Sequence, residues 1–136
     1  MLETILSQIT EELKNAGLSR VYTVFDNIPA DIKGGGVFAV VEIERFESTA
    51  PIYSEYSVFM PFRADAGISL IAPATMNMAQ LYDVFDRFVL PLADSMGSLT
   101  CSLKSAAVKK DGNIGRLVLK AEFSVSGISK HERSIK

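Results

Sequence analysis

The sequence has few of the residues that enzymes use most often as nucleophiles and bases. Its 136 residues include one histidine and one cysteine. A Ser-His-Asp or Cys-His arrangement needs a histidine held beside the nucleophile. His131 lies in the polar stretch 129–134, and Cys101 has no second cysteine at redox or metal-binding spacing. We therefore predict a solvated histidine, a small packed thiol, and no catalytic residue, cofactor site or metal site.

Net charge and hydropathy argue against nucleic-acid-binding and membrane proteins. The formal net charge of -2 argues against a broad basic face for nucleic acid or anionic membranes. Every apolar run stops well short of the roughly 20 residues that cross a bilayer, so we expect no transmembrane helix. The first residues lack the basic and apolar regions of a secretory signal. The expected partners are proteins rather than nucleic acids or membranes, and the lone cysteine is compatible with a reducing cytoplasm.

Three patterns imitate functional motifs but lack the necessary context. The glycines at 34–36 lack the Gly-Lys-Ser/Thr ending of a P-loop and precede a strand, which favours a flexible loop. Glu42 and Glu44 could imitate a carboxylate pair, but without a pocket, a histidine or a metal set we interpret them as solvated strand residues. Phe85 and Phe88 are interpreted as core residues rather than a ligand box.

Composition and length predict one folded domain. The apolar fraction of 48% and the charged fraction of 22% are typical of globular proteins, and 136 residues suit a single core. We predict a single α+β domain over residues 1–128 and a polar C-terminal tail over residues 129–136.

Hydrophobic periodicity predicts the elements of the first third. Apolar residues recur at helical spacing over residues 2–16, and Gly17 suits a left-handed C-cap. We expect a short strand over residues 20–25 and a loop over residues 26–36. Residues 37–46 alternate as a strand whose start should be buried on both faces and whose end should be exposed.

The middle of the chain contains a second β-rich stretch over residues 52–72. Pro61 removes one ladder donor from it and Gly67 weakens it, so we expect an edge strand or a bulged strand. A helix should begin near Asn77, with Gln80 completing a looser capping box.

The second helix and the last third complete the predicted fold. The helix should present one apolar stripe to the sheet, and should kink or restart at Pro91 before ending at Gly97. Residues 100–110 and 116–127 alternate on either side of an Asp-Gly turn and predict an antiparallel hairpin. The predicted fold class is α+β, with a mainly antiparallel sheet of four to five strands, two helices packed on one face, and the order αβββαββ.

This order of elements resembles the tail-terminator, or tail-completion, proteins of long-tailed bacteriophages and prophages, of the kind called minor tail protein U. The resemblance spans nearly the whole chain. It consists of the helix at 2–16, the Val-rich strand at 36–42, the Ala-Pro step that closes the strand ending at Pro73, the helix at 80–91 with its aromatic residues and proline, and the alternating strand at 115–125. It is a resemblance of pattern and not of an invariant signature.

The resemblance implies a non-enzymatic virion protein, made in the bacterial host cytoplasm, that forms a homo-oligomeric ring between tail-tube and head-connector proteins. Ring contacts need complementary surfaces, which loops and strand edges usually supply. The predicted interface residues are Asp26, Asn27, Lys33, Tyr53, Tyr56, Lys109, Lys110 and Asn113. The alternative is a small-ligand-binding α+β domain of a bacterial cytoplasmic protein, with a cavity between sheet and helices made possible by the small and large residues Ala106, Ala107, Ala121 and Phe123.

Overall fold

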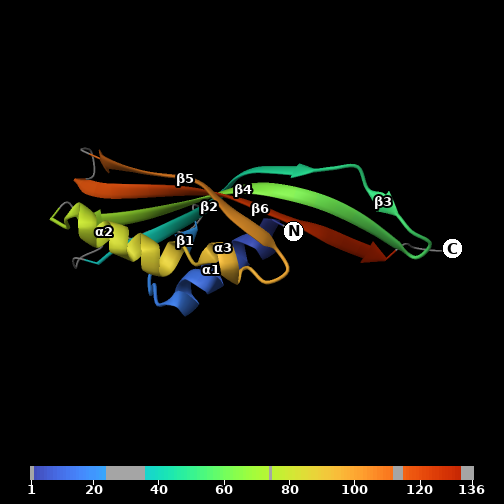
Figure 1. Cartoon of the computed structure of the whole chain (residues 1–136), viewed down its shortest axis with the longest axis horizontal. Coiled ribbons are helices and arrows are strands. Elements are labelled where there is room, and N and C mark those ends of the chain that lie inside the picture. Colours follow the sequence, from blue (N-terminus) through green and yellow to red (C-terminus); the bar gives the residue numbers. More distant parts are fainter. Residues whose placement is uncertain (1, 24–35, 74, 112–114, 133–136) are drawn as a thin grey trace.

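A long twisted sheet with helices on one face forms the molecule (Figure 1). The computed structural model describes residues 2–23, 36–73, 75–111 and 115–132. The elements, in chain order, are α1 (Leu2–Ala16), β1 (Val21–Thr23), β2 (Phe38–Ser48), β3 (Ile52–Tyr53), β4 (Ser57–Pro73), α2 (Met78–Val84), the π-helical turn η1 (Phe85–Val89), α3 (Leu92–Ser95), β5 (Thr100–Asp111) and β6 (Arg116–Glu132). The sheet order is β1-β2-β4-β6-β5, with β3 also paired to β4.

The predicted fold class is confirmed in its main features and wrong in its details. The fold is α+β, and every strand pair is antiparallel except β1 with β2, which is parallel. The described sheet has six strands instead of four to five, and the order αβββαββ is incomplete. The difference arises because the stretch predicted at 52–72 divides at a tight turn. The Ser54 amide donates to the Ser57 carbonyl at 2.8 Å, and β3 folds back on β4.

The expectation of an edge strand at 52–72 is wrong, because β4 lies inside the sheet between β2 and β6. Pro61 is tolerated there because its backbone faces the point where β2 has ended. Its carbonyl accepts from the Thr49 amide at 3.0 Å, and the ladder to β6 continues past it. The Glu44 carboxylate lies close over Gly67, and a Cβ atom there would be 2.5 Å from Glu44 Oε1, so a larger residue would displace this flexible side chain.

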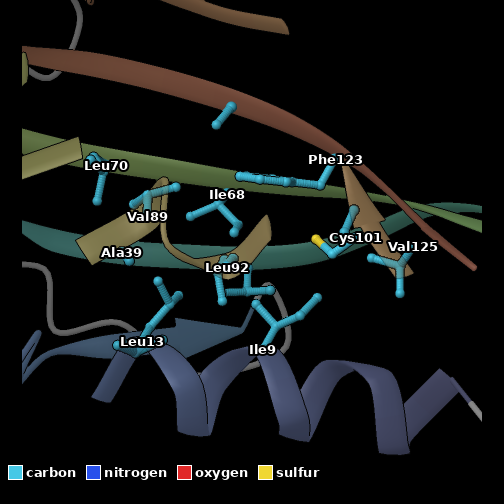
Figure 2. Packing of buried hydrophobic residues seen from close by; sticks show 14 of the residues in the cluster. Ile9, Leu13, Ala39, Ile68, Leu70, Val89, Leu92, Cys101, Phe123 and Val125 are labelled. Atoms are coloured by element: carbon cyan, nitrogen blue, oxygen red, sulfur yellow. The ribbon is translucent and has the colours of Figure 1, made fainter. Parts of the chain in front are cut away.

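One face of the sheet is apolar and packs against the helices. Figure 2 shows Ile9 and Leu13 of α1 directed towards Leu92 and the sheet. Alternate residues of β4 and β6 face the same core, and they include Ile68 and Phe123. Phe38, Ala39 and Val41 at the start of β2 are buried while residues 44–46 are exposed, as the sequence predicts.

The helices after β4 show the predicted cap and the predicted break. The Asn77 side chain accepts from the Gln80 amide, and the Gln80 side chain accepts from the Asn77 amide, which completes the capping box. Ahead of Pro91 the backbone widens into η1, where the Leu90 amide donates to the Phe85 carbonyl at 2.9 Å, five residues back. A proline crowds the preceding turn, and the wider turn relieves that crowding.

The same turn decides which apolar residues of this segment are buried deepest. Leu81, Val89 and Leu92 are fully buried, whereas Phe85 and Phe88 are only partly buried against the core. Full burial of both phenylalanines is therefore not observed. Phe88 instead covers the end of α1, where its ring would lie 3.1 Å from a Cβ atom at Gly17. Gly17 has a φ of 120°, so its lack of a side chain serves both the helix end and this contact.

The hairpin of β5 and β6 is antiparallel, as predicted, but β6 is longer than expected. Residues 129–132, predicted as part of a polar tail, continue β6 and pair with residues 57–60 of β4. Their polar side chains do not prevent pairing, because strand pairing uses the backbone. Figure 1 shows the helices beneath one part of the sheet only, with β3 and the neighbouring ends of β4 and β6 projecting beyond them.

Truncating the deepest residue of α2 tests this account of the core. Leu81→Ala should lower the free energy of unfolding by about 2 to 5 kcal/mol, because it leaves a cavity beneath the helix. Tyr82→Ala, at the exposed neighbouring position, should change it by less than about 0.5 kcal/mol. Urea denaturation of both variants measures the difference, and equal losses would contradict the packing described.

Candidate functional site

The most unusual surface is the projecting part of the sheet, which we call the arm: β3, the turn 54–56, residues 57–61 of β4 and residues 128–132 of β6. Large apolar side chains are exposed along it. The exposed fractions are 58% for Ile52, 65% for Tyr53, 63% for Tyr56 and 64% for Ile128. Clustered exposed apolar residues mark interaction sites more often than scattered ones do.

Strand register divides the arm into two apolar faces. Ile52 pairs with Phe59, and Pro61 pairs with Ile128, so these four side chains lie on the face away from the helices. Lys130 lies across from Phe59 on that face, with its Nζ 5.9 Å from the ring centroid. This surface suits burial against another protein, with aromatic and aliphatic area beside a cation.

A small hollow of about 170 Å³ lies on the other face of the arm. It is lined by Phe46, Ser48, Met60, Phe62, Ser129 and His131. Ser129 Oγ lies 2.8 Å from His131 Nε2, so the strand brings a serine and the histidine together, which the sequence analysis did not anticipate. No carboxylate among the described residues hydrogen-bonds the imidazole. The pair therefore lacks the third group that would orient the histidine as a base.

A larger groove of about 530 Å³ runs between the first turns of α1 and the outer edge of β2. Leu2, Glu3 and Leu6 line its helix side, and residues 42–46 line its strand side. β1 pairs only with residues 39–41 of β2, so the backbone edge beside the groove has no strand partner in the described chain. Its walls include the apolar residues Leu2, Leu6, Ile43 and Phe46.

Glu42 and Glu44 of β2 form an ion-pair cluster with Lys120 on the open face of the sheet. Lys120 Nζ lies 2.8 Å from Glu44 Oε1 and 3.6 Å from Glu42 Oε1. The hydrogen bond from Lys120 to Glu44 raises the pKa of the lysine, with smaller contributions from the charges of Glu44, Glu42 and Glu122. These side chains are partly exposed and paired, which agrees with their interpretation as solvated strand residues.

Cys101 is a packed thiol, as predicted. It is buried where β5 begins, within the core cluster. Burial raises the pKa of the Cys101 thiol to about 11, because a thiolate would be poorly solvated there.

The predicted interface residues do not form one site. Tyr53 and Tyr56 lie on the arm, whereas Lys109 and Lys110 lie near the end of β5 at the opposite end of the long axis (Figure 1). Asp26, Asn27, Lys33 and Asn113 fall outside the described residues. The groove beside β2 was not anticipated, because it depends on how far β1 extends along β2. The only signal in the sequence was the exposed end of that strand.

The described ranges contain neither a metal-type cluster nor a membrane-spanning helix. Among residues 2–23, 36–73, 75–111 and 115–132, no three His, Cys, Asp or Glu side chains are gathered as they would be around a metal ion. No helix in these ranges is long and apolar enough to cross a membrane.

Comparison of the sequence with known protein families and with curated proteins gives no match. Among solved structures, the type 4 fimbrial biogenesis protein PilO from Pseudomonas aeruginosa aligns over 97% of this chain and 72% of its own, with 12% identity and a TM-score of 0.34. The core region of PilO from the type IV pilus system of the same organism aligns over 71% and 84%, with 14% identity and a TM-score of 0.26. Similarity at this level establishes neither a shared fold nor a shared function.

The environment of Cys101 predicts slow reaction with thiol reagents. At pH 8, a pKa of about 11 leaves roughly one thiol in a thousand ionised, and the side chain is also buried. An aromatic disulfide reagent should react at least about a hundredfold more slowly with the native protein than with the urea-unfolded protein. Rapid native reaction would place Cys101 outside the core.

Proposed function

We propose that this protein is a non-enzymatic subunit of a phage or prophage tail, similar to a tail terminator that assembles as a ring where the tail tube meets the head connector. The pattern of elements along the sequence supports the family, and the arm supports an assembly role. In this proposal the protein lies in the virion tail. Its partners are further copies of the same chain, the tail-tube proteins and the head-connector proteins.

The arm is the observation that carries the proposal. A monomeric protein gains little from a three-stranded extension without a helix layer, since neither face of it buries a core. Four exposed apolar residues on that extension would be removed from water in a protein contact. Tyr53 and Tyr56 suit such a contact, because each combines a large apolar area with a hydroxyl group.

The opposite end of the sheet supplies the second contact that a subunit in an assembly needs. Lys109 and Lys110 are exposed near the end of β5. Exposed charges steer partners and set their register while contributing little to folding. Surfaces at both ends of the long axis suit a subunit that meets one neighbouring protein on each side of a junction.

The groove beside β2 favours a second candidate function, a small-ligand-binding α+β domain. Its volume of about 530 Å³ lies within the usual range of ligand sites. The residues first expected to leave room for a ligand do not line it, because Ala121 and Phe123 are packed in the core and Ala106 and Ala107 are exposed on β5. A strictly monomeric protein that retains a bound metabolite would favour this candidate.

Removing apolar area from the arm should weaken assembly and leave the fold intact. We expect Tyr56→Ser with Ile128→Ser to weaken association by about 30-fold, which corresponds to about 2 kcal/mol. Tyr82→Ser removes a similarly exposed aromatic from α2 and should have little effect. Light scattering across a concentration series measures the association of the arm variant and of the Tyr82→Ser control. Thermal unfolding checks that both variants are folded. Unchanged association of the arm variant would remove the arm from the interface.

Reversing the charges of Lys109 and Lys110 tests the proposed contact at the other end of the sheet. Lys109→Glu with Lys110→Glu should preserve the melting temperature and weaken assembly, because both lysines are exposed. Cys101→Ser and His131→Ala should each leave assembly nearly intact. Electron microscopy of phage assembled with the charge-reversed protein gives the functional readout. Tails of normal length joined to heads would contradict this surface, and turnover of a substrate at Cys101 or His131 would contradict the non-enzymatic function.

A further inference from the structure

The arm has projecting apolar side chains on one face and a hollow on the other. Ile52, Phe59, Pro61 and Ile128 lie on the open face, away from the helices, and Ile128 is 64% exposed. The hollow of about 170 Å³ lies on the opposite face, which we call the helix face. Because the arm projects beyond the helices, a partner fixed to one of these faces leaves the other in water (Figure 1).

The hollow has the size and the lining to hold one apolar side chain. The rings of Phe46 and Phe62 stack beside it with their centroids 5.7 Å apart, and Met60 adds a third apolar wall. An apolar cavity of about 150 Å³ holds a molecule of the size of benzene. The hollow therefore has room for one branched aliphatic or aromatic side chain, with the hydroxyl groups of Ser48 and Ser129 beside it.

Strand register places such a side chain directly behind the hollow. Met60 and Phe62 of β4 line the hollow, and Ile128 of β6 pairs with Pro61, which lies between them and faces the other way. Stacked sheets pack about 10 Å apart. A second copy laid on the helix face of the arm in the same orientation, at that distance, directs its Ile128 into the hollow without a shift along the strands.

The arm is too small to hold an isolated pair of copies together. Its strands contribute about five residues each, so each face measures roughly 15 Å in both directions. Stable pairs of proteins bury roughly 1,200 to 2,000 Å² in total. A repeated contact between unlike faces uses both faces of every arm, and in a closed ring no arm keeps an uncovered face.

The shape of the subunit favours a ring over a straight stack. Figure 1 shows helices beneath one part of the sheet only, so a copy is one layer thick at the arm and two layers thick at the helices. A helix layer adds about 10 Å of thickness, so copies that touch through their arms must spread apart at their helices. Each copy is then rotated relative to the last, and a repeated rotation closes into a ring when its angle permits.

We propose that the arms of neighbouring copies stack face to face, with Ile128 of one copy seated in the hollow of the next. The occupant is a second copy of this chain, because Ile128 and the hollow lie back to back on the same strands and one displacement satisfies both. Lys130 can keep its ammonium group in water at the border of the arm, since β5 pairs with β6 as far as residue 126. The contact rests on the proposed ring assembly and names the surface that builds it. Lys109 and Lys110 are not part of it.

A mixture of two single-cysteine proteins tests the contact directly. Ile128→Cys places a thiol on the open face, and Ser129→Cys places one beside the hollow. Facing side chains of two packed sheets can be joined by a disulfide, as in immunoglobulin domains. Under mild oxidation we expect a disulfide-linked dimer on a non-reducing gel from the mixture. Cys101 should not contribute, because it is buried.

Matched variants control for random collision and for the other ways in which two arms could meet. Ile128→Cys alone and Ser129→Cys alone should each remain monomeric on the gel, because like faces do not meet. Lys130→Cys moves the thiol by one residue to the open face, and its mixture with Ile128→Cys should give no dimer. A dimer of equal yield from any of these controls would overturn the stacking of unlike faces.

Thiol labelling checks that the hollow is open in a single copy. In dilute solution, the thiol of Ser129→Cys should react with a maleimide, and association at high concentration should protect it. A thiol that is protected at every dilution would show that the hollow is filled within one chain, and would overturn the contact.

Filling the hollow gives an independent measurement. Ser129→Phe places a ring where Ile128 of the next copy would lie, and should weaken association about tenfold or more. Ser105→Phe adds the same ring at an exposed position of β5, outside the arm, and should have a much smaller effect. Light scattering across a concentration series measures association, and thermal unfolding checks that both variants are folded.

The outcomes separate this contact from the function on which it rests. Association of the wild-type protein, with a dimer from the mixture and a weakened Ser129→Phe variant, supports both. Association without that dimer, or without an effect of Ser129→Phe, overturns the arm contact and leaves the proposed assembly standing. A wild-type protein that remains monomeric at every concentration, with no dimer from the mixture, overturns both.

Discussion

The pairing of β4 on both sides determines the shape of the molecule. β4 and β6 pair over their full 17 residues, and β2 pairs with most of β4 from the other side. A strand rises about 3.3 Å per residue, so these strands extend for roughly 55 Å. A helix rises only about 1.5 Å per residue, so the 15 residues of α1 cover roughly 22 Å. Together with α2, η1 and α3, this helix covers only part of the sheet that the strand pairing creates (Figure 1).

The parts of the sheet that no helix covers differ in their side chains, which are charged on the open face and apolar on the arm. Above the helices, the open face carries the Lys120 cluster with Glu42 and Glu44, and these charges allow the face to remain in water. Gly67 leaves space for the Glu44 carboxylate close to the strand. Beyond the helices, the arm exposes tyrosine and isoleucine instead. The ion-paired face is therefore compatible with solvent, whereas the arm leaves large apolar side chains exposed.

The two strand edges follow from the same geometry. In the described part of the chain, β1 is three residues long and pairs with residues 39–41 of β2. β5 closes the other side of the sheet without a helix over its outer edge (Figure 1). The arm and the outer edge of β5 are therefore separate surfaces of the described sheet.

The sequence alone determined the local elements, because helix periodicity, strand alternation, caps and turns depend on residues close together in the chain. It was sufficient for α1 and its Gly17 end, the Asn77 cap, the break at Pro91, the hairpin of β5 and β6, and the packed thiol. Only the tertiary structure decided that the strand with Pro61 lies inside the sheet, since tolerance of a proline depends on which neighbour its backbone faces. It also placed Ser129 and His131 in β6, and separated Tyr53 from Lys109 by most of the sheet. The arm and the groove depend on the lengths of strands that pair across long sequence separations. Local patterns carry no information about where that pairing stops.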